Sequence, residues 1–238
     1  MKTDKNQGTL FLVPTPLIDG QIQSLPTINS SIIRECKYFL VESLKLGRRH
    51  VKNMVTDFDF TQASFSELSK KTEPDEWEVL LAPALEGQDV CILSDAGSPV
   101  IADPGSNIVK MAHHKGISVV PLSGPSSVML ALMASGFSGQ QFTFHGYLPR
   151  DKQSLKNVLK KLEQEVRSGY TQIFMETPYR NIALFDQMIQ LLADATPLCI
   201  ACDLTSDLSF ISTKTIKQWR KKGRPDIHKR PCIFLLGQ

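Results

Sequence analysis

Short apolar runs alternate with more polar stretches along the first half of the chain. The apolar runs are TLFLVP (9–14), CKYFLV (36–41), DVCILS (89–94) and ISVVPL (117–122), and each ends at turn-forming residues. Residues 75–85 and 103–114, which lie between these runs, have the pattern of helices. Short, nearly continuous apolar strands separated by helices are typical of a parallel sheet that is buried on both faces. The first half is therefore predicted to be an α/β domain.

A second set of elements follows residue 122. PSSVMLALMASG (125–136) predicts a helix with proline in its first turn and glycine at its end. Another helix is predicted by an apolar stripe at helical spacing, formed by Leu155, Val158, Leu159, Leu162 and Val166. Strands are predicted at 141–146, 171–176, 197–202 and 232–237, with a helix over 180–192. We expect two α/β domains, residues 1–122 and 123–238.

Composition agrees with a folded chain of this kind. The chain has 238 residues, of which 42% are hydrophobic and 21% charged, and its net charge of +3 does not by itself call for a nucleic-acid partner. No apolar run is long enough to cross a bilayer, and the N-terminus lacks the pattern of a signal peptide. Five cysteines without a signal peptide indicate reduced thiols. A cytoplasmic protein without membrane contact is expected.

The stretch LSDAGSPVIADPG (93–105) is the strongest candidate for a ligand-binding loop. Asp95, Gly97, Ser98 and Pro99 follow a predicted strand, at the carboxyl edge where open α/β sheets bind ligands. Glycine permits close approach of the backbone, and aspartate accepts hydrogen bonds. A second glycine turn, LSGPSS (122–127), also joins a strand to a helix. The alternative is two ordinary turns, with Asp103 capping the next helix and Pro104 at its first position.

Several other kinds of site lack their sequence patterns. Neither G-x-G-x-x-G nor G-x-x-x-x-G-K-[ST] is present, and no cluster of acids or histidines predicts a metal site. Cys199 and Cys202 form a C-x-x-C, but a spacing of three within a strand places them on opposite faces. They are interpreted as buried thiols. His113 and His114 are expected at a helix end, where they complement its dipole.

Taken together, the motifs resemble the SAM-dependent tetrapyrrole methylase superfamily. Within it, the match is to the branch of bacterial 16S ribosomal RNA 2′-O-ribose methyltransferases that act on a cytidine. The matching pieces are LFLVPTPL (10–17), Glu42, LSDAGSPVIADPG (93–105), VVPLSGPSSVMLAL (119–132), FHGYLPR (144–150), FMETPYR (174–180) and ACDLTS (201–206). They follow the order of the family and cover nearly the whole chain.

The resemblance implies two α/β domains of the tetrapyrrole methylase type with S-adenosylmethionine (SAM) in the cleft between them, and usually a homodimer. It assigns Asp95, Gly97 and Ser98 to the methionine part of SAM, and Met175 and Ala201 to its adenine and ribose. The remaining residues that it assigns to the cofactor are Pro14, Ser126, Ser127 and Val128. A ribose hydroxyl must also lose its proton, for which Glu42, Lys45 and Glu176 are candidates by position. The sequence does not choose among these three.

The sequence departs from this branch where the acceptor would bind. PTPLIDGQ lacks the branch's Gly-Asn turn, VESLK (41–45) keeps Glu42 but loses the Asp-Thr-Arg that follows it, and CDLTS (202–206) lacks an arginine and a lysine. The final strand is preceded by KRP (229–231) in place of Gly-Glu. Three interpretations therefore stay open: an enzyme that methylates small-subunit ribosomal RNA, a methyltransferase for a small heterocycle or a protein, and a non-catalytic SAM-binding dimer.

A basic stretch near the C-terminus is the main sequence signal for RNA. Residues 214–230 contain eight lysines or arginines and one acid, and residues 47–52 and 149–152 add further positive charge. Such residues can follow an RNA backbone. The alternative is an ordinary solvated helix and loop. Trp219 is the one aromatic residue in this stretch, so a series of stacking aromatic residues is absent.

Overall fold

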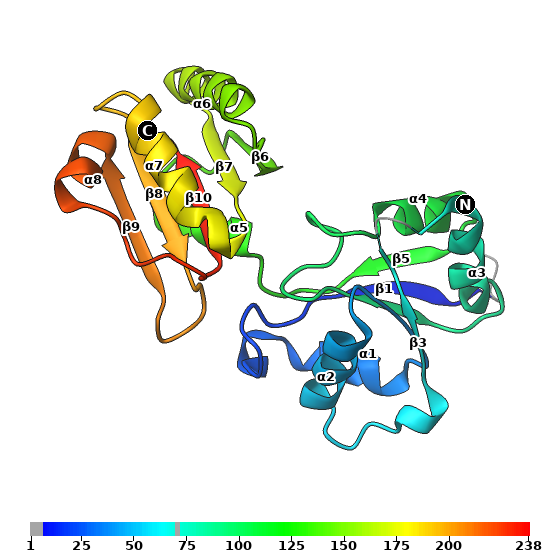
Figure 1. Cartoon of the computed structure of the whole chain (residues 1–238). Helices are drawn as coiled ribbons and strands as arrows, with labels where there is room; N and C mark the ends of the chain where they lie inside the picture. Colours follow the sequence, from blue (N-terminus) through cyan, green and yellow to red (C-terminus); the bar gives the residue numbers. More distant parts are fainter. Residues whose placement is uncertain (1–6, 70–71) are drawn as a thin grey trace. The chain divides into compact units, whose positions relative to one another are not determined.

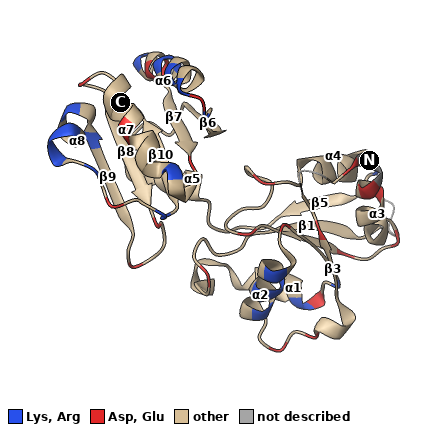
Figure 2. Cartoon of the chain, viewed as in Figure 1, with Lys and Arg blue, Asp and Glu red and all other residues tan. Residues whose placement is uncertain are grey.

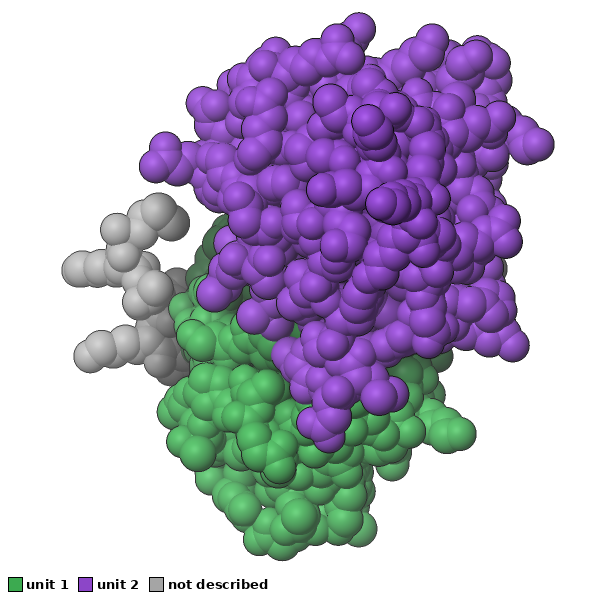
Figure 3. Space-filling model, turned by 90° about the vertical axis from the view of Figure 1, so that its left-hand side faces the viewer, with its two compact units in different colours: residues 1–126 green, residues 127–238 purple. Residues whose placement is uncertain are grey.

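The computed structural model describes residues 7–69 and 72–238, and the chain forms two compact units (Figures 1 and 3). Unit 1 comprises residues 1–126 and unit 2 residues 127–238. The boundary expected from the sequence lies after residue 122, within the loop that leads into unit 2. Each unit has its own sheet and its own buried core.

Unit 1 is built on a five-stranded parallel sheet. Its strands are β1 (Thr9–Val13), β2 (Tyr38–Val41), β3 (Ser64–Glu67), β4 (Val90–Leu93) and β5 (Ser118–Pro121), in the order β3-β2-β4-β1-β5. Every adjacent pair in this sheet is parallel. Alternate residues of β4 belong to two separate hydrophobic clusters, Ile92 to one and Cys91 to the other. The predicted parallel sheet with two buried faces is confirmed.

Helices cover both faces of this sheet. α1 (Thr27–Glu35) and α2 (Leu44–Met54) contribute to one hydrophobic cluster, and α3 (Pro74–Leu85) and α4 (Ser106–His114) to the other. Short 3-10 helices η1 (Ile22–Ser24) and η2 (Phe60–Gln62) lie in the connections. Ser43 is the N-cap of α2, because its side chain accepts a hydrogen bond from the backbone NH of Leu46 at 3.4 Å. This cap lies two residues after Val41, the last residue of β2, and α2 begins at the next residue, Leu44.

The prediction that Asp103 and Pro104 begin a helix is wrong. α4 starts at Ser106, and its N-cap is Gly105, whose φ is +128°. The chain is still turning before that point, with φ of +72° at Val100 and +67° at Ala102. Left-handed backbone at a β-branched residue such as Val100 is strained. His113 and His114 do lie in the last turn of α4, as expected.

Unit 2 has a mixed five-stranded sheet. Its strands are β6 (Phe142–Tyr147), β7 (Thr171–Met175), β8 (Pro197–Cys202), β9 (Phe210–Thr215) and β10 (Cys232–Leu236), in the order β6-β7-β10-β8-β9. β6 and β7 are parallel, whereas β10 is antiparallel to both of its neighbours and β8 is antiparallel to β9. The last strand of the chain therefore lies at the centre of the sheet.

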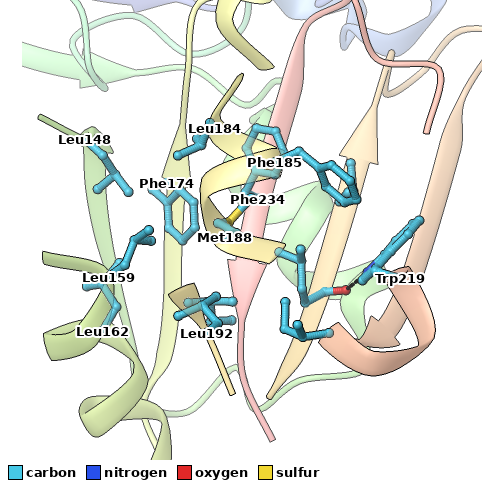
Figure 4. Close-up of a cluster of buried hydrophobic side chains, with 14 of the residues drawn as sticks. Leu148, Leu159, Leu162, Phe174, Leu184, Phe185, Met188, Leu192, Trp219 and Phe234 are labelled. Atoms are coloured by element: carbon cyan, nitrogen blue, oxygen red, sulfur yellow. Dashed lines mark hydrogen bonds between the residues drawn. The ribbon is translucent and has the colours of Figure 1, made fainter. Parts of the chain in front are cut away.

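One face of this sheet carries the main core of unit 2 (Figure 4). α6 (Lys152–Arg167), α7 (Asn181–Leu191) and α8 (Ile216–Lys222) contribute buried residues to this core, and the 3-10 helix η3 (Pro178–Arg180) precedes α7. Trp219 is fully buried, and its indole NH donates to the carbonyl of Leu198 at 2.9 Å. α5 (Ser127–Ser135) contacts β8, β9 and β10.

Candidate functional site

Three loops that follow β1, β4 and β5 meet at the carboxyl edge of the parallel sheet in unit 1. The backbone NH of Thr15 donates to the carbonyl of Gly97 at 2.9 Å, and the NH of Gly97 donates back to Thr15 at 3.1 Å. The NH of Leu122, at the start of the third loop, donates to Leu12 of β1 at 2.9 Å. The candidate loop after β4 is thus held by main-chain hydrogen bonds rather than by side chains alone.

Hydroxyl groups strengthen this junction. The Ser94 hydroxyl donates to the Gly97 carbonyl at 2.6 Å, and the Thr15 hydroxyl donates to the Ser94 carbonyl at 3.2 Å. Ser98 donates to the carbonyl of Pro125 at 3.2 Å, which joins the loop after β4 to the loop after β5. Thr15 is fully buried and Ser94 almost so. Neither is among the predicted site residues, although Thr15 lies inside LFLVPTPL (10–17) and Ser94 inside LSDAGSPVIADPG (93–105).

Two glycines permit the close approach of these loops. Gly97 has a φ of +80°, and a Cβ placed there would lie 2.9 Å from a methyl group of Leu17 and 3.3 Å from the carbonyl oxygen of Pro125. A Cβ at Gly124 would lie 2.2 Å from the Cβ of Pro14. Pro14 therefore packs against the loop that contains Ser126, and the predicted residues of unit 1 lie along one connected edge.

The backbone of Asp95 is hydrogen-bonded by Glu42, which follows β2, and lies within hydrogen-bond distance of His50 of α2. Its backbone NH donates to the carboxylate of Glu42 at 3.3 Å, and its carbonyl oxygen is 2.9 Å from Nε2 of His50. Burial raises the pKa of the Asp95 carboxyl group; the His50 charge and the backbone NH of Ser43 oppose that shift, and Glu67 adds to it. A partly buried carboxylate that keeps an NH donor is suited to an ammonium group.

The His50 side chain forms the hydrogen bond that joins α2 to this loop. It is 3% exposed, and because a carbonyl oxygen can only accept, Nε2 must carry the hydrogen. Nδ1 is buried and has no hydrogen-bond partner within the described residues. Gly47 lets α2 lie close to β2, since a Cβ there would be 2.4 Å from a methyl carbon of Val41. The role of His50 was not predicted, because it depends on how α2 docks.

In unit 2, the two predicted adenosine-binding residues lie in one row of the sheet. Met175 of β7 and Ala201 of β8 are both directly opposite Ile233 of β10. Residues in register on adjacent strands point to the same face, so these three side chains form a continuous apolar strip. Ile211 of β9 extends the strip beyond Ala201. Ile233 was missed because its place depends on β10 entering the sheet between β7 and β8.

α5 lies on the same face as this strip. The carbonyl of Ser135, its last residue, accepts from the hydroxyl of Thr213 at 2.7 Å, and Phe137 packs against Gly237, just beyond β10. The C-terminal end of α5 therefore lies beside β9 and the end of β10. Ser127 and Val128 are the first two residues of this helix, and Val128 is buried.

The three candidates for a proton acceptor differ in their surroundings. One Glu176 oxygen accepts from the NH and hydroxyl of Thr177 at 2.7 and 3.2 Å, and the other accepts from Nε of Arg180 at 2.9 Å. Glu42 accepts from Asp95, as described above. Lys45 is exposed in the first turn of α2. Glu42 and Lys45 are thus close in sequence to the residues that hydrogen-bond Asp95. Both oxygens of Glu176, in contrast, are already hydrogen-bonded within its own turn.

A family comparison agrees with this architecture. The model for the Tetrapyrrole (Corrin/Porphyrin) Methylases matches residues 31–218, most of the chain. The chain belongs to the tetrapyrrole methylase family. It is accordingly a SAM-dependent methyltransferase.

Curated relatives and a solved structure resemble this methylase along most of its length. It is 31% identical over 233 residues to "Ribosomal RNA small subunit methyltransferase I" of Escherichia coli O157:H7, covering 98% of this chain and 78% of the relative. The protein of the same name from Thermotoga maritima is 33% identical over 192 residues, covering 79% of each chain. The crystal structure of the methyltransferase CobJ superposes with a TM-score of 0.65 at 15% identity, covering 97% of this chain and 94% of that one. The last match shows a shared fold.

The basic stretch of this methylase is largely engaged within unit 2. Arg220 pairs with Asp194 and caps the end of α7, Arg224 pairs with Asp186, and Arg230 pairs with Asp203 at 2.6 Å. The ammonium groups of Lys214 and Lys222 lie over the Trp219 ring. Its three arginines therefore have structural partners that explain them.

Arg230 provides a test of this structural role. Besides Asp203, it donates to the carbonyls of Asp226 and Leu208 at 2.6 and 2.8 Å. We expect Arg230→Met to lower the free energy of unfolding by about 2 kcal/mol, because partly buried acceptors lose their donor. Arg224→Met, which removes an exposed pair, is the control and should cost under about 1 kcal/mol. Urea unfolding measures both, and equal losses would contradict the assignment.

The other features have simple structural accounts. Cys199 and Cys202 are buried free thiols three residues apart on β8, as expected. Among the residues that the structure describes, no three or more His, Cys, Asp or Glu side chains gather as they would around a metal ion. No helix in the same residues is both long and apolar enough to cross a membrane.

Proposed function

We propose that this methylase transfers the methyl group of SAM to a ribose 2′-hydroxyl of small-subunit ribosomal RNA, in the cytoplasm. The observation that carries the proposal is similarity along 98% of the chain to a relative named for methylation of that RNA. The loop DAGSP and the loop SGPSS, which the sequence resemblance assigns to the cofactor, are joined in unit 1 by the Ser98–Pro125 hydrogen bond. A homodimer is part of the proposal.

The residues present fit SAM. The methionine part is assigned to the Asp95–Ser98 loop, where a carboxylate and backbone groups suit a zwitterionic amino acid. The adenosine part is assigned to the strip that contains Met175 and Ala201, whose apolar surface suits a flat ring. The cofactor assignment also includes Pro14, Gly97 and Ser126 of unit 1 and Ser127 and Val128 of unit 2.

The chain contributes mainly position and a dry environment to this chemistry. SAM, when bound, supplies a methyl group on a positively charged sulfonium, which is already a good leaving group. The protein must align the acceptor oxygen with that methyl group and exclude water. It must also provide for loss of the hydroxyl proton. Glu42 and Lys45 keep this role in the proposal, whereas the Glu176 oxygens are already held by Thr177 and Arg180.

The deciding experiment uses purified full-length protein and SAM labelled in its methyl group. Three acceptor preparations are tested in parallel: unmodified small ribosomal subunits, a protein extract freed of RNA, and an extract of small metabolites. Label in RNA, followed by nuclease digestion to a nucleoside methylated on its ribose, supports the proposal. Label in protein or in metabolites with none in RNA would assign the enzyme to another acceptor, and SAM binding without any transfer would indicate a non-catalytic dimer.

The pKa of Asp95 gives a pH-dependent prediction. Burial raises this pKa, so the carboxylate loses its charge at a higher pH than an ordinary aspartate of about 3.9. If it binds the SAM ammonium group, affinity is full at neutral pH and falls as pH drops through the raised pKa. Calorimetry from neutral pH downward should show the affinity of the wild type beginning to fall at a higher pH than an ordinary aspartate would give. The Asp95→Asn variant should bind SAM roughly tenfold more weakly at neutral pH, and its affinity should change little with pH. A flat wild-type profile would argue against the Asp95 assignment.

A further inference from the structure

Four lysines in the first ten residues of α6 are exposed. Lys152, Lys156 and Lys160 follow one side of the helix at a spacing of four, and Lys161 lies about 100° further around it. These four residues are here called the α6 lysine face. None of the four side chains makes a hydrogen bond or an ion pair within residues 7–69 and 72–238. Figure 2 shows this helix as one of the most strongly blue elements of unit 2. The row has no internal partner that explains it.

The placement of these charges opposes the stability of the helix. Cations are unfavourable near a helix N-terminus, yet Lys152 and Lys156 occupy the first two turns, and no acid lies in the first turn beyond the cap Asp151. Lys152, Lys156 and Lys160 are also spaced four apart, so that like charges repel along one face. The acids of α6, Glu163 and Glu165, lie instead in its C-terminal half. A structural role does not account for this arrangement.

α8 shows the opposite arrangement. Three of its four basic residues, Arg220, Lys221 and Lys222, lie in the last turn, where positive charge complements the helix dipole; the fourth, Lys217, lies in the first turn. Arg220 also forms the ion pair and carbonyl contacts described above. Most of the positive charge in α8 therefore lies where the helix dipole favours it, whereas the positive charge in the first half of α6 does not.

The topology of unit 2 fixes the end of the sheet at which α6 begins. α6 covers the face of the sheet that carries Phe174, whereas Met175 and Ala201 point to the opposite face. β6 and β7 are parallel neighbours, so α6 must return from the carboxyl end of β6 to the amino end of β7. The first turn of α6 therefore lies at the sheet edge where β7 ends at Met175. Lys152 and Lys156 lie nearer to that edge than Lys160 and Lys161 do.

We propose that the α6 lysine face binds the phosphate backbone of the acceptor RNA. The inference rests on the proposed function and identifies α6, rather than the basic stretch 214–230, as the contact surface. Lysines at successive turns form a line of charge about 12 Å long, since four residues rise about 6 Å. α6 contains no aromatic residue, which suits contacts with phosphates rather than with bases. An acidic polypeptide is the competing partner.

Salt-dependent binding tests this proposal. A fluorescent single-stranded RNA fragment of the small-subunit ribosomal RNA is titrated with full-length protein between 50 and 300 mM salt. Replacing all four lysines with glutamine should reduce the slope of log affinity against log salt by about 3, at roughly 0.7 for each phosphate contact. SAM affinity should not change. The melting temperature should stay the same or rise, because the repulsion within the helix is removed.

Matched pairs of substitutions separate the site from net charge. Lys156→Gln with Lys160→Gln is compared with Lys217→Gln with Lys221→Gln, which removes two exposed lysines at the same spacing from α8. The α6 pair should reduce the slope by about 1.4 and the α8 pair should leave it nearly unchanged. Equal effects of both pairs, or no effect of the fourfold variant, would overturn the proposal.

The remaining outcomes distinguish this proposal from the proposed function. If RNA binding depends on the α6 lysine face but no methyl group is transferred to RNA, the proposed function is rejected and the α6 lysine face is kept as an RNA-binding surface. If the enzyme methylates RNA and the fourfold variant shows an unchanged salt slope, the proposed function is kept and the α6 lysine face is rejected as the contact surface. If the wild type bound poly-L-glutamate through these lysines and did not bind RNA, an acidic polypeptide would replace RNA as the partner.

Discussion

Gly97→Ala is expected to weaken SAM binding by roughly thirtyfold, which corresponds to about 2 kcal/mol. The added methyl group would lie 2.9 Å from the Leu17 side chain and 3.3 Å from the Pro125 carbonyl, so the loop must move. Movement would stretch the pair of main-chain hydrogen bonds between Gly97 and Thr15 and the bond from Ser94. Calorimetry with SAM gives the affinity, and urea unfolding shows whether unit 1 remains folded.

Gly116→Ala is the control for this substitution. Gly116 has a φ of +76°, close to the +80° of Gly97, and the nearest atom to its added Cβ is 3.8 Å away. Both variants share the cost of left-handed backbone at alanine, about 1 kcal/mol. The difference between them in SAM affinity therefore reports the contacts of the loop. If the two variants bind SAM equally well, the Asp95–Ser98 loop is not part of the cofactor site.

Most of the buried strands could be predicted from the sequence, because their apolar runs are continuous. β4, for example, was predicted at 89–94 and spans Val90–Leu93. β3 (SFSE) and β9 (FISTKT) were not predicted, since both are edge strands in which only part of the side chains is covered. α2 was not identified either, because its glycine and five basic residues obscure a helix that docks through Gly47, His50 and Val51.

The loops of the candidate site could be predicted from the sequence, but the hydrogen bonds and packing that join them could not. The turns after β1, β4 and β5 carry recognisable glycine and proline motifs, and parallel strands bring their carboxyl ends to one edge. No local pattern encodes the tertiary contacts that join these loops. These contacts include the β-bridge between Thr15 and Gly97 and the hydrogen bond between His50 and the Asp95 carbonyl. The shared row of Met175 and Ala201 likewise depends on β10, which is 57 residues later in the chain than β7, counted from Met175 to Cys232.

His50→Leu is expected to lower SAM affinity by roughly tenfold with little change in kcat. Leucine fills a similar volume but cannot donate to the Asp95 carbonyl, and an unsatisfied partly buried carbonyl costs about 1–3 kcal/mol. The loop can relieve that cost by moving toward water, which displaces the residues that would meet the methionine part of SAM. His50 acts here as a positioning residue, because its contact is with the loop.

Two further substitutions separate positioning from simple packing. Gln places its amide nitrogen near the position of Nε2, whereas the shorter Asn places its amide nitrogen near the position of Nδ1. Since the contact is made by Nε2, His50→Gln should restore much of the SAM affinity and His50→Asn should not. The KM for SAM should follow the same order, with melting temperatures recorded for each variant. If Leu, Gln and Asn lower the affinity only in proportion to their loss of stability, His50 is a packing residue of α2 and its hydrogen bond to Asp95 has no separate effect on the cofactor.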